Sequence, residues 1–165
     1  MRPADAGTFT VAAEPVDGPA SGALLREYFT DIGSRHLGRA VTDAELDAAL
    51  AEDSSDDLTP PRGMFLVLRR DGQPAGSVGL RHLAADIGEV KRLYVAPSAR
   101  GRGAGRLLLA AVERHARGWG VRRLRLDTRA DLIEARGLYR ATGYAEIPAY
   151  NDGRYAECWY EKLLS

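Results

Sequence analysis

The segment from residue 100 to residue 106 carries the pattern that most clearly points to chemistry. It reads Arg-Gly-Arg-Gly-Ala-Gly-Arg and stands between an extended stretch and a helical one. Alternating glycines let the backbone approach a ligand closely, and the free N–H groups at a helix start attract anionic oxygens. Three arginines in the same segment add positive charge. The segment predicts an anion site, and a tight turn without a ligand is the alternative.

Two familiar nucleotide-binding patterns do not fit this segment. A G-x-G-x-x-G dinucleotide fingerprint would need glycine at position 106 or 108, where Arg106 and Leu108 stand. A G-x-x-x-x-G-K-[ST] phosphate loop would need a nearby lysine, and the only lysines of the chain are Lys91 and Lys162. What remains is the pattern Arg-x-x-Gly-x-Gly after a strand.

The elements that must position this segment follow from the spacing of apolar residues. A β-prone stretch opens the chain, and a loop with Pro15, Gly18, Pro19 and Gly22 follows it. A helix with apolar residues at helical spacing is expected to end at Gly33, and a capping-box pattern begins a second helix at residue 42. The acidic, proline-containing stretch 53–61 is expected to be an exposed loop that could flank a substrate site.

The second half of the chain alternates strands and helices. A hairpin is expected at 64–80 with its turn at 69–72, and a further strand ends before Pro97. Helical spacing then resumes after the glycine-rich segment and stops at glycines 118 and 120. The remaining expected elements are a strand at 121–127, a helix at 132–142 and a last strand at 155–164. These elements predict an α+β domain with a mixed sheet.

Two ordered motifs make the sequence similar to the GNAT superfamily of acetyl-CoA-dependent N-acetyltransferases. The first is Arg-x-x-Gly-x-Gly at 100–105, and the second is Leu138-Tyr139-Arg140-Ala141-Thr142-Gly143-Tyr144, which matches the family pattern Leu-Tyr-x-x-x-Gly-Phe/Tyr. The resemblance covers residues 64–164, and the end of the chain is similar to a bacterial subgroup of unassigned substrate. It implies one GNAT-like domain over residues 1–165, with a mostly antiparallel mixed sheet of about six to seven strands and about four flanking helices.

The resemblance also implies acetyl-CoA as the cofactor and a place for each part of it. The pyrophosphate would lie on the amides of residues 102–106, and the pantetheine arm would pair with the backbone of the preceding strand like an added half-strand. An amide of that strand, from Tyr94 or Val95, would polarise the thioester carbonyl. The predicted cofactor-binding residues are Leu93, Tyr94, Val95, Arg100, Gly101, Arg102, Gly103, Ala104, Gly105 and Arg106.

Acetyl transfer to an amine needs a neutral nucleophile and a proton for the departing thiolate. Alkyl amines, with a pKa near ~10.4, are mostly protonated at neutral pH, so a base is useful. Glu89 stands where many relatives hold such a base, and the alternative is an ordinary carboxylate paired with an arginine. Tyr139 matches the tyrosine that reprotonates the sulfur in relatives, and the alternative is helix packing.

The acceptor site is less defined by the sequence. Tyr150 and Asn151 lie in a loop where relatives often shape the acceptor pocket, with loop packing as the alternative. The acidic loop 52–57 hints weakly at a cationic acceptor, and a solvated loop is the favoured alternative. Many relatives contact the cofactor through an asparagine before the last helix, but residues 127–132 read Asp-Thr-Arg-Ala-Asp-Leu, which puts that contact in doubt.

Composition excludes several other classes of protein. Basic and acidic residues balance at 23 each, so no global field recruits nucleic acid, and the alternating arginines at 122, 123 and 125 are expected to form a solvated face. A single cysteine, Cys158, allows no intrachain disulfide, and the scattered histidines His36, His82 and His115 show no metal-ligand spacing. No metal site is expected, and Cys158 and the histidines are expected to be structural.

The sequence therefore predicts an enzyme that acetylates a primary amine by direct attack in a ternary complex. The acceptor is a small-molecule or peptide amine. No apolar run approaches the ~18–20 residues of a membrane span, and no signal peptide is visible, so a cytoplasmic protein is expected. The resemblance allows a homodimer, since dimers are frequent among relatives. The alternative function is a non-catalytic acyl-CoA sensor or interaction module on the same fold.

Overall fold

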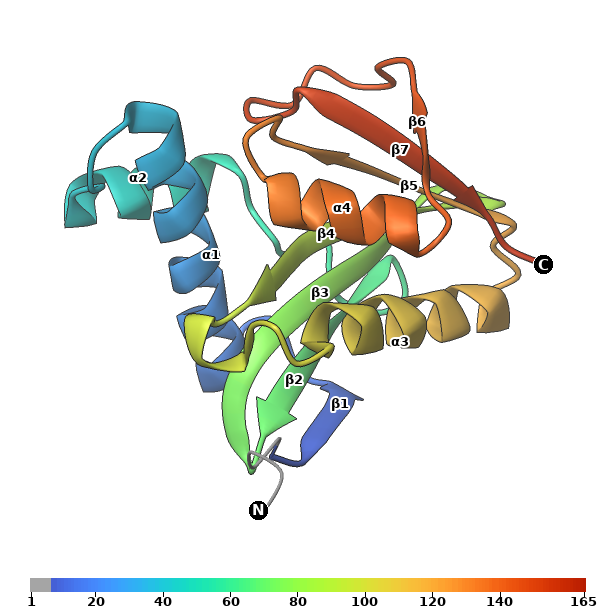
Figure 1. Cartoon of the computed structure of the whole chain (residues 1–165), viewed down its shortest axis with the longest axis horizontal. Coiled ribbons are helices and arrows are strands. Elements are labelled where there is room, and N and C mark those ends of the chain that lie inside the picture. Colours follow the sequence, from blue (N-terminus) through green and yellow to red (C-terminus); the bar gives the residue numbers. More distant parts are fainter. Residues whose placement is uncertain (1–6) are drawn as a thin grey trace.

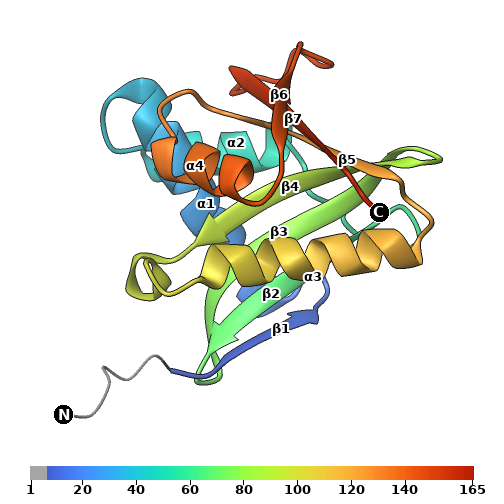
Figure 2. The same ribbon diagram turned by 45° about the vertical axis from the view of Figure 1, so that its right-hand side comes forward.

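Residues 7–165 are described by the structure, a computed structural model, and they form one mixed sheet with helices on both faces (Figures 1 and 2). The sheet has seven strands in the order β1-β2-β3-β4-β5-β7-β6, and only the β4–β5 pair is parallel. The predicted fold class is confirmed. The strands are β1 (Phe9–Ala13), β2 (Gly63–Arg70), β3 (Gln73–Ala84), β4 (Ile87–Val95), β5 (Arg123–Thr128), β6 (Ala145–Ile147) and β7 (Cys158–Leu163). The helices are α1 (Pro19–Leu37), α2 (Asp43–Glu52), the short 3-10 helix η1 (Pro97–Ala99), α3 (Ala104–Gly118) and α4 (Ile133–Ala141).

Alternation along the central strands divides the core between the two faces of the sheet. On β2, Leu66 and Leu68 pack in the larger cluster with α3 and α4, whereas Phe65 and Val67 pack in a smaller cluster with α1. Side chains two apart on a strand point to the same face, which explains this division. Figure 2 shows α3 in front of the sheet and α1 with α2 behind it.

Strand β4 shares only a short stretch with its parallel neighbour. Pairing with β5 is confined to residues 87–89 of β4 and 123–125 of β5, after which the two strands diverge (Figure 1). On its other edge β4 pairs with β3, and the register shifts between Ser77 and Gly79. Arg92 lies opposite this shift with φ 57°, a left-handed conformation that a non-glycine residue rarely adopts. The bulge bends β4 at the place where β5 leaves it.

Helix α1 is longer at both ends than the sequence predicted. It begins at Pro19, so Pro19 and Gly22 lie in the helix and not in the expected loop, because proline fits the first turn of a helix. It continues through Gly33, where a Cβ atom would lie 2.8 Å from Cγ1 of Val41. That glycine permits a close approach, and Gly38, with φ 71°, ends the helix instead.

The remaining elements confirm most of the predicted pattern. In α2 the capping box is present, because Thr42 and Glu45 exchange backbone-to-side-chain hydrogen bonds of 3.1 Å each. The short edge strand β6 was not predicted, since its three residues, two exposed and one half-buried, carry no clear alternation. The last strand begins at Cys158, later than expected, and the residues before it form a loop.

Candidate functional site

A pocket of about 970 Å³ opens where β4 and β5 diverge. Its walls come from α1, the end of α2, β4, the start of α3, β5, α4 and the loop between β6 and β7. One end of the pocket is formed by the segment that runs from β4 into α3. The other end is formed by side chains from α1, α2, β5 and the β6–β7 loop.

Backbone groups dominate the end at α3. The first intrahelical hydrogen bond runs from the N–H of Leu107 to the carbonyl of Gly103, over 3.1 Å, so the amides of residues 104–106 precede it. Gly103 caps the helix with φ 82°, and a Cβ atom there would meet no other atom within 4 Å. These amides and the positive end of the helix dipole are the groups that the predicted anion site would use, and that site stays a prediction.

The predicted cofactor residues gather around this end of the pocket. Arg100 donates from Nε to the carbonyl of Val95 over 2.9 Å and so ties the loop to the end of β4. At Gly105 a Cβ atom would lie 2.7 Å from Cδ2 of Leu138, so this glycine lets α3 pack against α4. Arg102 is not part of the pocket wall. The predicted residues that line the pocket are Leu93, Tyr94, Val95, Arg100, Gly101, Gly103, Ala104, Gly105 and Arg106.

Tyr139 lies on α4 with its ring packed against Tyr144 and Tyr160, and it also lines the pocket. Its exposed fraction is 5%, and its hydroxyl makes no hydrogen bond within the part of the chain that the structure describes. Burial, followed by the nearby charges, raises the pKa of this phenol well above its usual range. Tyr139 therefore stays protonated at neutral pH and presents a hydrogen-bond donor to the pocket.

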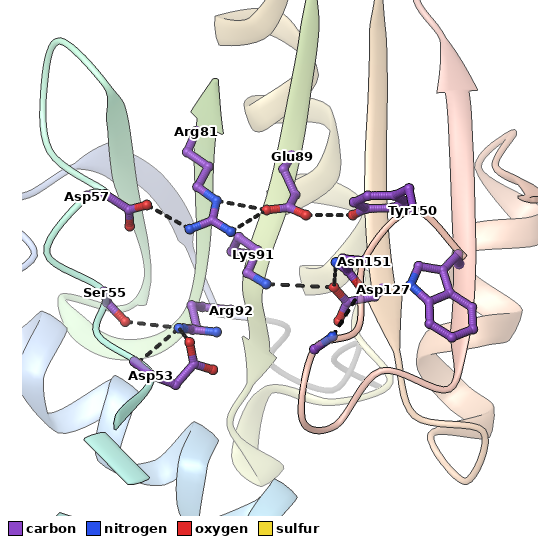
Figure 3. A network of polar contacts seen from close by, with 12 residues as sticks. Asp53, Ser55, Asp57, Arg81, Glu89, Lys91, Arg92, Asp127, Tyr150 and Asn151 are labelled. Carbon is purple, nitrogen blue, oxygen red and sulfur yellow. Dashed lines mark hydrogen bonds and ion pairs between the residues drawn. The ribbon is translucent and has the colours of Figure 1, made fainter. Parts of the chain in front are cut away.

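Glu89 lies on β4 with an exposed fraction of 1%, and both of its carboxylate oxygens accept hydrogen bonds (Figure 3). Arg81 approaches Oε1 with Nε at 2.8 Å and Nη2 at 2.7 Å. Tyr150 donates its hydroxyl to Oε2 over 2.6 Å. Neither Glu89 nor Tyr150 lines the pocket. Catalysis by Glu89 stays a prediction, and the geometry favours the alternative of a carboxylate paired with an arginine.

Asn151, the second predicted acceptor residue, does line the pocket, and it holds a carboxylate that the sequence analysis did not select. Its Nδ2 donates to Oδ2 of Asp127 over 2.8 Å, while its Oδ1 accepts from Nε1 of Trp159, also over 2.8 Å. Asp127 is the penultimate residue of β5 and also lines the pocket. An acidic residue at the carboxyl end of a strand was the available signal, but only the fold shows that this end faces a pocket.

Three carboxylates of the acidic loop, Glu52, Asp53 and Asp57, are paired with arginines. Arg92 is 5% exposed and contacts Asp53 at 3.0 Å and Ser55 at 3.1 Å, and its guanidinium lies 4.9 Å from the ring centroid of Phe29. Arg81 contacts Asp57 at 2.7 Å, next to its contact with Glu89 (Figure 3). The loop is therefore a wall held to β3 and β4 and not a free cluster of negative charge.

Other predicted residues have structural positions. Cys158 is buried in the larger core cluster, which confirms a core cysteine. His82 stacks on Trp119 with centroids 4.7 Å apart, and His36 contacts Tyr155. No group of metal-ligating side chains occurs in residues 7–165. Over the same range, every helix is too short or too polar to cross a bilayer.

Comparison with known proteins decides the family. A family model described as "Acetyltransferase (GNAT) family" matches residues 24–144. The chain belongs to the GNAT family. This membership confirms the resemblance inferred from the two motifs, and it confirms an acetyltransferase enzyme.

Two curated relatives illustrate the range of GNAT proteins that resemble this chain. An uncharacterized N-acetyltransferase of Escherichia coli (strain K12), YjgM, is 30% identical over 135 residues, which are 79% of this chain and 78% of that protein. The aminoglycoside N(6')-acetyltransferase type 1 of Stenotrophomonas maltophilia is 36% identical over 91 residues, which are 50% of this chain and 60% of that enzyme.

A solved GNAT structure supports the fold independently of sequence. The PaiA N-acetyltransferase of Thermoplasma acidophilum, solved in complex with coenzyme A, superposes with a TM-score of 0.72. The match covers 94% of this chain and 99% of that one at 17% identity. The likeness therefore concerns the arrangement of strands and helices.

Proposed function

We propose that this GNAT-family chain transfers an acetyl group from acetyl-CoA to a primary amine by direct attack in a ternary complex. The observation that carries the proposal is the pocket between the diverging strands β4 and β5. At one end it presents the unpaired amides of a helix start, and at the other it presents Asp127, Asn151 and neighbouring side chains. One cavity can therefore receive an anionic donor and an amine acceptor together.

The residues present fit the donor substrate. Amides of residues 104–106 and the left-handed Gly103 leave open space for a pyrophosphate beside the helix dipole. Beyond Glu89, the edge of β4 that faces the pocket has no pairing strand among residues 7–165, so its backbone is available to an amide-rich pantetheine arm. Leu93, Tyr94 and Val95 would hold that arm, and an amide of Tyr94 or Val95 would donate to the carbonyl of the thioester.

The bound donor supplies an acetyl thioester, whose C–S bond breaks as the acceptor nitrogen forms a C–N bond. Tyr139 would give its hydroxyl proton to the departing thiolate. Its raised pKa keeps that proton in place until the negative charge on sulfur develops. No group of the chain needs to carry the acetyl group, and Cys158, the only cysteine, is buried in the core.

The acceptor is a small-molecule or peptide amine. Mixed charges surround the acceptor end, where Arg154 pairs with Glu52 at 2.6 Å and Lys91 lies 3.7 Å from Asp127. The similarity to an aminoglycoside acetyltransferase makes polyamino sugars a first class to try, together with amino acids, peptides and polyamines.

A thermal-shift titration with acetyl-CoA, CoA, ATP and NAD side by side tests the donor site, because a ligand that binds the native state raises its apparent stability. We expect shifts with the two CoA species alone. Release of free thiol from acetyl-CoA with a panel of amines then tests catalysis. If CoA raises the melting temperature but no amine leads to thiol release, the result would point to an acyl-CoA sensor. If CoA does not raise the melting temperature, the result would contradict the donor site itself.

A further inference from the structure

Asp127 is the pocket carboxylate whose surroundings suit direct contact with an acceptor amine. It is the penultimate residue of β5, beyond the last residue that pairs with β4, and its side chain is 17% exposed. The charged and titratable groups that face it come from several elements. They are Tyr28 on α1, Lys91 on β4, Tyr139 on α4 and Tyr150 in the β6–β7 loop.

One oxygen of Asp127 is held and the other is open. Oδ2 accepts from Nδ2 of Asn151 over 2.8 Å, and Nζ of Lys91 lies 3.7 Å from the same oxygen (Figure 3). Oδ1 accepts no hydrogen bond from any residue in the range 7–165. Because Trp159 donates to Oδ1 of Asn151, the amide nitrogen of Asn151 must face Asp127. The carboxylate is therefore oriented through Oδ2, and Oδ1 has no partner among the described residues.

Glu89 shows the opposite arrangement. Arg81 occupies Oε1 and Tyr150 occupies Oε2, and the side chain lies outside the pocket wall. A general base needs an available lone pair within hydrogen-bond reach of the proton that it takes. Asp127 lines the pocket and keeps one oxygen without a hydrogen bond, whereas Glu89 is 1% exposed and lies outside the pocket wall, so its remaining lone pair is out of reach of a substrate.

Asp127 lies in the same pocket as Tyr139, the proposed acid. Both Asp127 and Tyr139 line the pocket, and the negative charge of Asp127 contributes to the raised pKa of Tyr139. A carboxylate and a protonated phenol thus lie close enough to interact electrostatically. These are the two proton-handling groups that acyl transfer to an amine needs.

We propose that Asp127, and not Glu89, binds the acceptor nitrogen and takes a proton from it as the C–N bond forms, while Asn151 orients the carboxylate. This inference rests on the proposed function. Attack makes the nitrogen positively charged, and its N–H proton passes to Oδ1 of Asp127. The C–S bond breaks, the thiolate takes the proton of Tyr139, and Tyr139 regains a proton as Asp127 releases one to solvent. The amine therefore loses one proton, the thiolate gains one, and Asp127 and Tyr139 return to their starting states.

Asp127→Asn is the first test, because it keeps an acceptor for Asn151 and removes the base. On the best amine of a panel of lysine, a tripeptide, spermidine and an aminoglycoside, we expect kcat to fall about 100-fold or more. The acetyl-CoA thermal shift should be unchanged. Calorimetry with CoA present should show weaker binding of the same amine, which gives a readout independent of turnover.

Asp127→Ala with added formate separates a chemical role from a structural one. Formate can occupy the vacated site and accept the proton, so we expect at least a ten-fold recovery of activity, which a merely structural role would not give. Asp86→Asn serves as the control for removal of a carboxylate charge, because Asp86 is exposed, lies outside the pocket wall and makes no side-chain hydrogen bond or ion pair in residues 7–165. Its kcat should stay within a factor of three of the wild type.

Glu89→Gln decides between the two carboxylates. The assignment would be overturned if kcat fell about 100-fold in Glu89→Gln while Asp127→Asn stayed fully active. The proposed function would stand in that case. Should Glu89→Gln fail to fold, Tyr150→Phe replaces it, because it frees one oxygen of Glu89 and leaves the Arg81 pair in place. A wild-type chain that neither shifts with CoA nor releases thiol would overturn the proposed function, and the role of Asp127 with it.

Discussion

The two ends of the pocket are built from different parts of the chain and from different chemical groups. Residues 93–106 form the end at α3 as one continuous segment, largely through backbone amides and glycine conformations. The other end brings together side chains from α1, α2, β5 and the β6–β7 loop. Beside it, hydrogen bonds and ion pairs join side chains of β3, β4, β5, the loop after α2 and the β6–β7 loop (Figure 3). A backbone site depends on a few local conformations, whereas a side-chain site depends on every contact that positions its members.

This difference predicts separable effects of substitution. Changes at the α3 end should weaken donor binding, and changes at the acceptor end should alter turnover or acceptor binding while donor affinity stays the same. Tyr139 lies between the two ends and should affect the chemical step alone.

Gly103→Val should have the largest effect on the donor. Valine at φ 82° is strongly strained, and its side chain would enter the open space beside the helix start. We expect CoA affinity to fall at least about 100-fold by calorimetry, equivalent to about 3 kcal/mol.

Gly120→Val is the matched control for that strain. Gly120 has φ 78° and lies after α3, away from the pocket, and a Cβ atom there would meet no other atom within 4 Å. Both variants should lose comparable thermal stability, and only Gly103→Val should lose CoA affinity. Equal CoA affinities in the two variants would contradict a backbone-built donor site.

Tyr139→Phe should lower kcat about 10- to 100-fold, because the thiolate loses its proton donor. The KM for acetyl-CoA should change by less than about two-fold, since the ring that packs in the core is retained. Tyr144→Phe is the control: its ring contacts Tyr139, and its buried hydroxyl has no hydrogen-bonding partner in residues 7–165. Steady-state kinetics in which both variants behave alike would remove the acid role.

Arg92→Ala should destabilise the acceptor wall by about 2 kcal/mol, because Arg92 is buried and joins β4 to the loop after α2. The free energy of unfolding should fall by about 1 kcal/mol less in Arg92→Gly than in Arg92→Ala, since glycine accepts φ 57° without strain. Urea unfolding measures both values. We expect a raised acceptor KM and unchanged CoA affinity, and the reverse result would show that the bulge of β4 serves the donor end.

Glu45→Gln should have the smallest effect, and only in acid. The hydrogen bond from Arg39, together with the backbone of Thr42, lowers the pKa of Glu45 from 4.5 to about 2. A lowered folded-state pKa stabilises α2 above pH 4.5, and this contribution is lost as the pH falls towards 2. Amide exchange should show α2 losing protection across that window before α3 does in the wild type, and the variant should lose this pH dependence. If the protection of α2 depended on pH in the same way in the wild type and in Glu45→Gln, the role of the capping box would be contradicted.

Local patterns predicted much of the fold because they act over a few residues. The capping box at Thr42 and Glu45 formed as expected, and so did the helix start after the glycine-rich segment. Errors arose where a distant residue decided the outcome. Gly33 was expected to end α1, but its lack of a side chain serves the approach of Val41.

The candidate site divides in the same way. The sequence by itself predicted an anion-binding end, because its glycines, arginines and helix start are adjacent in the chain and need no partner to be recognised. It also placed Glu89, Tyr139 and Asn151 near the site. Only the tertiary structure decided which carboxylate is available, since Arg81 and Tyr150 occupy Glu89 while Asn151 leaves one oxygen of Asp127 open. Hydrogen-bond occupancy depends on residues brought together across the sheet, and spacing along one chain does not encode it.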